Sequence, residues 1–195
     1  MKRGIVGIDE AGRGPLAGPV AVGAIFIPPK TKISFRGLAD SKALTEEERE
    51  RWFQKIRSWQ KERKLFYVVS LVSHKVIDKK GIVPAIRLGI ARNLKKLNVN
   101  SRTVEVLLDG ALKAPLNFPH QKTIIRGDEK IPAIALASIV AKVTRDRRMK
   151  SLGIQFPQYG FGIHKGYGTK AHKKNLKKHG ISEIHRKSFL KNFDK

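Results

Sequence analysis

Three acidic side chains in this sequence follow apolar stretches that are typical of buried strands. Asp9 and Glu10 come directly after the apolar residues 4–8, and Asp109 comes directly after residues 103–108. Neighbouring residues of a regular strand point to opposite faces, so Asp9 and Glu10 can serve one site only where the strand ends and the backbone turns. The glycine-rich stretch that follows them provides such a turn. Ligands of open α/β sheets bind beyond the carboxyl ends of the strands, so the three carboxylates converge if their strands are neighbours.

A fourth carboxylate can come from either of two aspartates. Asp146 lies on a predicted helix, on the same face as Ser138 and Lys142. Asp128 instead precedes a helix start, where an anion near the helix N-terminus needs no further explanation. We therefore favour Asp146. Taken alone, Asp109 with the glycine after it is better explained as a strand-ending turn, so the hypothesis of a site depends on the whole set.

Carboxylates gathered in one cleft repel each other and raise each other's pKa values unless a cation neutralises them. The sequence has no Cys, which excludes disulfides and thiol catalysis, and it has no suitable His cluster. The ligands are therefore all oxygen, a set that favours Mg²⁺ or Mn²⁺. Two such ions, about 4 Å apart, can activate water and stabilise the leaving 3′-oxygen of a phosphodiester. In a protein that binds nucleic acid, these acids predict metal-assisted phosphodiester hydrolysis.

The charge of the chain points to such a partner. Its 195 residues contain 41 Lys and Arg against 16 Asp and Glu, a formal net charge of +25. This excess implies a polyanion, because each neutralised phosphate releases counterions. A membrane surface is the rival partner, but no apolar run approaches the ~18 residues of a membrane span, and there is no signal peptide or lipidation motif. We therefore expect nucleic acid as the partner, no membrane, and a cytoplasmic protein.

Strand and helix patterns predict one α/β domain over residues 1–195. Apolar, β-branched runs predict strands over residues 4–8, 19–27, 65–72, 103–108 and 123–125. Helices are predicted over about 46–62, after a capping box of Thr45 and Glu48, and over 83–97, 132–146 and 169–179. Residues 141–195 contain 15 Lys and Arg against 3 Asp and Glu. We therefore expect residues 1–150, approximately, to form the catalytic core and about 151–195 to form a basic part that binds substrate.

Residues 7–20, with the sequence GIDEAGRGPLAGPV, resemble the N-terminal motif of bacterial type 2 ribonuclease H, ribonuclease HII. The resemblance continues in order through residues 40–42, 107–110, 127–128, 137–146, 156–161 and 164–167, and so covers nearly the whole chain. It implies an RNase H-like fold, a central mixed five-stranded sheet flanked by helices with a helical C-terminal part. The sequence departs from the family pattern at Ile86, Gly89, Ala135 and Leu136. These differences affect helix packing or substrate contacts and leave the carboxylates intact.

The resemblance implies an endoribonuclease that cuts the RNA strand of RNA/DNA hybrids and the 5′ side of single ribonucleotides in duplex DNA. Its products carry 3′-hydroxyl and 5′-phosphate ends, and two divalent ions, Mg²⁺ or Mn²⁺, are its cofactors. Carried over by position, the catalytic and metal-binding residues are Asp9, Glu10, Asp109 and Asp146. Asp128, Ser138 and Lys142 match supporting positions. We expect a monomer, and the sequence does not say whether a replication clamp or polymerase recruits it.

The same resemblance assigns substrate contacts. A glycine-lined backbone at Gly12 and Gly14 approaches a sugar closely, so that its main-chain groups can read the 2′-hydroxyl that distinguishes RNA from DNA. Tyr167 matches a tyrosine that stacks on the deoxyribose after the ribonucleotide. Phosphate contacts that position the strand without reading sequence are expected from the cationic side chains Arg13, Lys42 and Lys165. We expect no catalytic role for His164, His172 or His185.

Three other functions stay open. The related type 3 enzyme carries an additional N-terminal substrate-binding domain, for which a catalytic strand beginning at residue 4 leaves no room. A DNA resolvase or integrase on the same fold needs the same acids but no sensor of the 2′-hydroxyl. A non-catalytic basic RNA-binding protein explains the charge but gives Asp9, Glu10 and Asp109 no common purpose.

Overall fold

A mixed five-stranded sheet forms the centre of the protein. The computed structural model describes residues 3–38 and 44–191. Its strands are β1 (Gly4–Ala11), β2 (Val20–Ile27), β3 (Phe66–Val72), β4 (Val104–Asp109) and β5 (Gln121–Ile124), in the spatial order β3-β2-β1-β4-β5. β2 pairs antiparallel with β1 and β3, whereas β4 pairs parallel with β1 and β5. The expected RNase H-like sheet is therefore confirmed.

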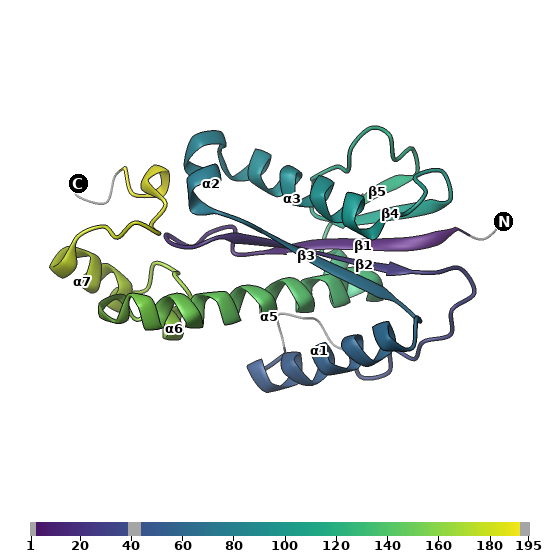
Figure 1. Cartoon of the computed structure of the whole chain (residues 1–195), viewed down its shortest axis with the longest axis horizontal. Helices are drawn as coiled ribbons and strands as arrows, with labels where there is room; N and C mark the ends of the chain where they lie inside the picture. Colours follow the sequence, from purple (N-terminus) through teal and green to yellow (C-terminus); the bar gives the residue numbers. More distant parts are fainter. Residues whose placement is uncertain (1–2, 39–43, 192–195) are drawn as a thin grey trace.

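Helices cover both faces of this sheet. α5 (Pro132–Gln155) crosses one face with α1 (Glu46–Lys61) beside it, while α2 (His74–Lys80) and α3 (Ile82–Leu97) cover the other face (Figure 1). The shorter elements are α4 (Gly127–Lys130), η1 (Pro157–Tyr159), α6 (Phe161–His164), α7 (Lys170–His179) and η2 (Lys187–Phe189). α6 and α7 lie at the end of the molecule toward which β1 runs (Figure 1). The carboxyl end of β1 therefore meets the basic C-terminal segments.

Several predicted boundaries were wrong. α5 continues nine residues past the predicted end at Asp146, since Met149 and Leu152 still bury their side chains. α2 was not predicted, because only Ile77 is buried in its seven residues. β1 does not end before the acids: Asp9 and Glu10 stay paired with Gly23 and Val22 of β2, and only the pairing with β4 stops, at Ile8 opposite Leu108. The site therefore opens where β4 ends.

The close contact between α5 and the sheet depends on small residues. A Cβ atom added at Gly7 would lie 2.2 Å from the backbone of Ala133, so that only glycine fits in the middle of β1. Ala137 and Ala141, one and two turns farther along α5, are also fully buried. Small side chains let helix and sheet approach closely. This contact brings the polar residues of α5 beside the carboxyl end of β1.

Two buried histidines lie in the core of the C-terminal part. His172 Nδ1 lies 2.9 Å from the carbonyl oxygen of Tyr167 and must donate to it, which leaves His172 Nε2 as an acceptor. His185 Nε2, 3.0 Å away, donates to that atom, and His185 Nδ1 accepts from the Ser182 amide at 2.9 Å. Both imidazoles are therefore neutral. Burial lowers the pKa of each, and it lowers the pKa of His185 to about 4.

This arrangement predicts that stability falls in mild acid. His185 titrates near pH ~6.5 in the unfolded chain, so between pH ~6.5 and about 4 the unfolded state binds a proton that the folded state excludes. We expect the melting temperature to drop by about 5 °C as the pH falls through this window. His185→Asn keeps an acceptor for Ser182 and should show a smaller drop in thermal scans at pH 7 and pH 4.5. Equal drops in both proteins would contradict the assignment.

Candidate active site

A pocket of about 430 Å³ opens at the carboxyl ends of β1 and β4. It brings together most of the residues expected to form the site. Its lining consists of Asp9, Glu10, Ala11, Gly12, Arg13, Gly14, Arg49, Asp109, Ser138, Lys142 and Tyr167. A larger cavity, of about 750 Å³, lies at the opposite end of the sheet around Phe26 and Phe66, and none of its described lining residues is acidic. The pocket with the carboxylates is therefore the candidate active site.

Asp9 and Asp109 lie side by side because their strands are paired in parallel, with Ile8 opposite Leu108. Asp9 is buried and accepts hydrogen bonds from the Glu10 amide, at 2.7 Å, and from the Ser138 side chain. Burial raises the pKa of Asp9 to about 8; the Ser138 hydrogen bond opposes this shift, and the charges of Glu10 and Asp109 add to it. A cation in this pocket would favour the ionised carboxylate.

Glu10 and Asp109 have distinct partners. Arg13 Nη1 lies 3.2 Å from Glu10 Oε1 in an ion pair. Burial raises the pKa of Glu10, and the Arg13 charge opposes this shift. Asp109 Oδ1 accepts a hydrogen bond from the Gly127 amide at 2.7 Å, which fixes the carboxylate at the start of α4. The Asp109 side chain also contributes to the pocket lining.

The three carboxylates suit a hard divalent cation by their chemistry. All potential ligands are oxygens, and burial with mutual repulsion raises the pKa values of Asp9 and Glu10, as expected for acids that a cation would stabilise. In the described part of the chain, no three His, Asp or Glu side chains are yet close enough to hold a metal ion together. Holding one ion between all three carboxylates would therefore require these side chains to come closer together.

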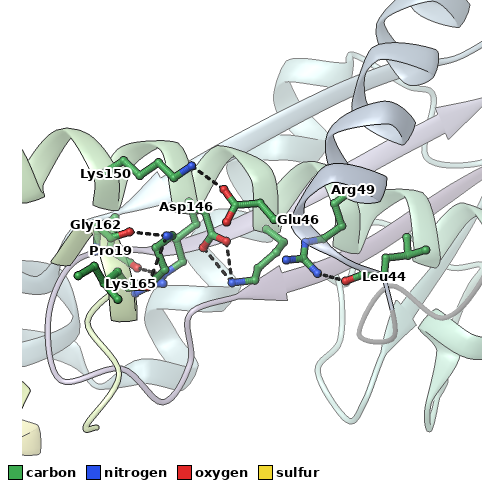
Figure 2. Close-up of polar contacts among 11 residues, drawn as sticks. Pro19, Leu44, Glu46, Arg49, Asp146, Lys150, Gly162 and Lys165 are labelled. Atoms are coloured by element: carbon green, nitrogen blue, oxygen red, sulfur yellow. Dashed lines mark hydrogen bonds and ion pairs between the residues drawn. The ribbon is translucent and has the colours of Figure 1, made fainter. Parts of the chain in front are cut away.

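Asp146 lies next to the pocket but does not line it. Its carboxylate is buried and pairs with Lys142 Nζ at 2.8 Å, one turn away on α5. Lys150 Nζ lies 2.5 Å from Glu46 at the start of α1, beside this pair (Figure 2). Lys142 itself lines the pocket, whereas Asp146 lines a separate small cavity of about 80 Å³ together with Glu46 and Arg49. In this structure Asp146 is held by a lysine rather than gathered with Asp9, Glu10 and Asp109.

The remaining expected residues lie outside the pocket lining. Asp128 is buried in α4 and borders a separate small cavity of about 100 Å³. Lys165, for which a phosphate contact was expected, is buried, and its ammonium group donates to Gly162 O at 2.5 Å (Figure 2). That bond closes the last turn of α6, and Lys165 does not line the pocket. Lys42 lies outside the described residues.

Arg49 lines the pocket and was not foreseen. It lies in the first turn of α1, and its Nη1 donates to the carbonyl of Leu44 (Figure 2). A cation in the first turn of a helix is disfavoured by the helix dipole, and the other residues of this turn, Glu46, Glu47 and Glu48, are all acidic. A basic residue in this otherwise acidic turn is the feature of the sequence from which Arg49 could have been identified. Arg49 adds a positive charge opposite the carboxylates.

Comparison with known proteins agrees with this site and fold. The family model described as Ribonuclease HII matches residues 6–192. The chain belongs to the ribonuclease HII family. Ribonuclease HII of Bacillus mycoides is 46% identical over 185 residues, which are 95% of this chain and 68% of that protein. Ribonuclease HII of Ruminiclostridium cellulolyticum is 43% identical over 189 residues, 97% of this chain and 71% of that protein.

Solved structures share the fold. RNase HII in the PCNA:RNase HII complex from Archaeoglobus fulgidus is 26% identical, with a TM-score of 0.76 over 93% of both chains. Ribonuclease H2 from Pyrococcus horikoshii OT3 is 25% identical, with a TM-score of 0.70 over 98% of this chain and 99% of that chain. Family membership makes this protein a metal-dependent type 2 ribonuclease H and supports activity on RNA/DNA hybrids. No helix in the described part of the chain is long and apolar enough to span a membrane.

Proposed function

We propose that this enzyme hydrolyses the phosphodiester on the 5′ side of a ribonucleotide, in RNA/DNA hybrids and at single ribonucleotides within duplex DNA. One observation carries the proposal: three carboxylates, the loop of residues 12–14 and Tyr167 line the same pocket. A nuclease needs the acids, and a nuclease that distinguishes RNA from DNA also needs a group that reads the sugar. The products are 3′-hydroxyl and 5′-phosphate ends.

Asp9, Glu10 and Asp109 would hold two divalent ions, with Asp146 completing the set once it is released from Lys142. When bound, Mg²⁺ or Mn²⁺ supplies the activation of water and the stabilisation of the leaving oxygen. A type 3 ribonuclease H whose fold this chain shares, Bst-RNase HIII, has been solved in complex with Mn²⁺, at 18% identity and a TM-score of 0.70 over 96% of this chain and 65% of that chain. Ser138 orients Asp9 through a hydrogen bond, and Lys142 holds the Asp146 carboxylate in an ion pair.

Substrate recognition falls to the groups around the acids. The main chain at Gly12 and Gly14 lies at the pocket surface and can approach the 2′-hydroxyl closely. Tyr167 is 41% exposed, so its ring is available to stack on a sugar. The exposed Arg13 side chain and Arg49 both line the pocket and can contact phosphates. We propose a monomer in which residues 1–150, approximately, catalyse and the basic residues that follow hold the duplex.

The test compares three labelled duplexes of one sequence: all DNA, DNA with a single ribonucleotide, and a long RNA/DNA hybrid. With Mg²⁺ or Mn²⁺ we expect cleavage of the second on the 5′ side of the ribonucleotide and cleavage throughout the RNA of the third. EDTA should abolish both activities and added Mg²⁺ should restore them. Equal cleavage of the all-DNA duplex would favour a resolvase-type nuclease, and binding without cleavage would favour an RNA-binding protein.

A further inference from the structure

Two arginines are fully buried behind the pocket. Arg145 on α5 and Arg186 near the C-terminus each have a relative exposure of 0%. Among the described residues, neither guanidinium lies within ion-pair distance of a carboxylate, since neither occurs in any described ion pair. Burial lowers the pKa of both side chains, that of Arg186 to about 9. Burying two cations without a carboxylate partner lowers the free energy of unfolding. Other contacts must therefore compensate for this loss.

Their hydrogen bonds all go to one segment. Arg186 donates to three main-chain oxygens, those of Gly12 at 2.7 Å, Arg13 at 2.9 Å and Gly18 at 3.0 Å. Arg145 donates to the oxygens of Pro19, at 2.9 Å, and Ala17, at 3.3 Å. The guanidinium groups therefore engage five carbonyls of the turn that joins β1 to β2, including two from the loop that lines the pocket.

This support matters because the loop has little rigidity of its own. Gly12 has a φ of +89° and glycine is flexible in isolation. Carbonyls engaged by a buried fork-shaped group are held in one direction, and charge-assisted hydrogen bonds of this kind are strong. The pocket side of the loop is thereby kept in one conformation before any substrate binds. A loop that reads a single hydroxyl needs such preorganisation.

Arg186 is itself held firmly. Its amide donates to Leu16 O at 2.7 Å, and the Gly18 amide donates to Ile184 O at 2.9 Å. On the other side, Asp78 of α2 accepts from the amides of Lys187 and Ser188 at 3.0 and 2.9 Å. The guanidinium therefore projects from a backbone fixed on both sides.

His185, the residue before Arg186, is connected to the segment that carries Tyr167. His185 donates to His172, which in turn donates to the carbonyl of Tyr167. Arg145 also lies 5.7 Å from the centre of the Tyr167 ring, close enough for a cation–π contact. Arg186 thus contacts the glycine loop directly, and His185 is linked to the main chain of Tyr167 through His172.

We propose that Arg186, supported by Arg145, is a positioning residue that determines how well this enzyme recognises a single ribonucleotide. The inference rests on the proposed function, because it concerns the same loop and Tyr167. In a long hybrid every residue of the cleaved strand offers a 2′-hydroxyl, so a displaced loop still finds productive registers. In a duplex with one ribonucleotide there is only one register, and cleavage depends on the loop being in place.

The experiment is Arg186→Lys, which keeps the charge but cannot reach three carbonyls with one ammonium group. We expect kcat/KM for the single-ribonucleotide duplex to fall about tenfold more than kcat/KM for the hybrid, mainly through KM, as the loss of one or two charge-assisted hydrogen bonds implies. Arg92→Lys, an exposed substitution on α3, is the matched control and should leave the ratio unchanged.

The ratio separates positioning from a merely structural role, which would lower both activities equally. An unchanged ratio in Arg186→Lys, at any absolute rate, would overturn the proposal. If this variant does not fold, Arg145→Lys decides in the same way, since it removes the bonds to Ala17 and Pro19 and should shift the ratio in the same direction. Failure of the proposed function is recognised separately, because the wild-type enzyme would then not cut the single-ribonucleotide duplex at all.

Discussion

Asp109→Asn should abolish cleavage while the protein stays folded and still binds an RNA/DNA hybrid. Asparagine keeps the side-chain oxygen that accepts from the Gly127 amide, so the carboxyl end of β4 loses only its negative charge. Without that charge the remaining acids cannot hold two ions, and we expect the rate to fall at least about a thousandfold, or ~4 kcal/mol of transition-state stabilisation. Single-turnover cleavage and fluorescence anisotropy measure the two effects.

The matched control is Glu105→Gln on the same strand. Glu105 pairs with Lys122 on the neighbouring strand β5, outside the pocket. It should leave cleavage and melting temperature nearly unchanged, because exposed ion pairs contribute little to stability. Cleavage by Asp109→Asn at the wild-type rate would refute the candidate active site, and loss of hybrid binding would show that Asp109 is needed for more than chemistry.

Gly12→Ala should destabilise the protein and impair cleavage together. An added Cβ would lie 1.9 Å from Arg145 Nε, and the φ of +89° is strained for any side chain. Because Arg145 is buried and bonded to Pro19, neither partner can move without breaking the support of the loop. We expect a loss of ~3 kcal/mol, seen as a melting temperature lower by about 10 °C, and a fall in kcat/KM of about a hundredfold.

Gly14→Ala provides the control for the stability measurement. A Cβ at Gly14 would meet no atom within 4 Å, so the melting temperature should change by less than about 1 °C. The cleavage activity of Gly14→Ala tests a separate question, namely whether a side chain at this position obstructs the approach of the loop to the substrate. A Gly12→Ala protein as stable as Gly14→Ala would show that the contact between Gly12 and Arg145 does not hold the loop.

The local elements were predictable because short-range chemistry specifies them. Thr45 and Glu48 form both hydrogen bonds of the capping box at the start of α1, as their spacing predicts. Apolar runs predicted β1, β2 and β4, because these strands are buried on both faces and leave few polar positions. α2 escaped prediction because one buried side chain in seven residues gives no periodic signal.

The arrangement of the acids was only partly predictable. The sequence indicated that Asp9 and Asp109 end apolar runs, and the parallel pairing of β1 and β4 does place them together. It placed the end of the first strand at Ile8 and the turn in the glycine-rich stretch after Glu10, whereas β1 continues along β2 to Ala11 before the chain turns. The pairing of Asp146 with Lys142, outside the pocket that the other acids line, depends on side-chain contacts that the sequence does not show.

Taken by itself, the sequence determined the family, the class of chemistry and the kind of partner, because motif residues and net charge are properties of the chain alone. The tertiary structure decided which Lys and Arg side chains are buried and support the loop, and which remain exposed to solvent. Nothing in a chain with 41 Lys and Arg distinguishes Arg145 and Arg186, buried beneath the loop, or Lys165, turned toward its own helix, from solvent-exposed cations elsewhere. The hydrogen-bond partners of Arg145 and Arg186 lie more than a hundred residues away in the chain, so the roles of these two arginines become visible only when those segments pack together.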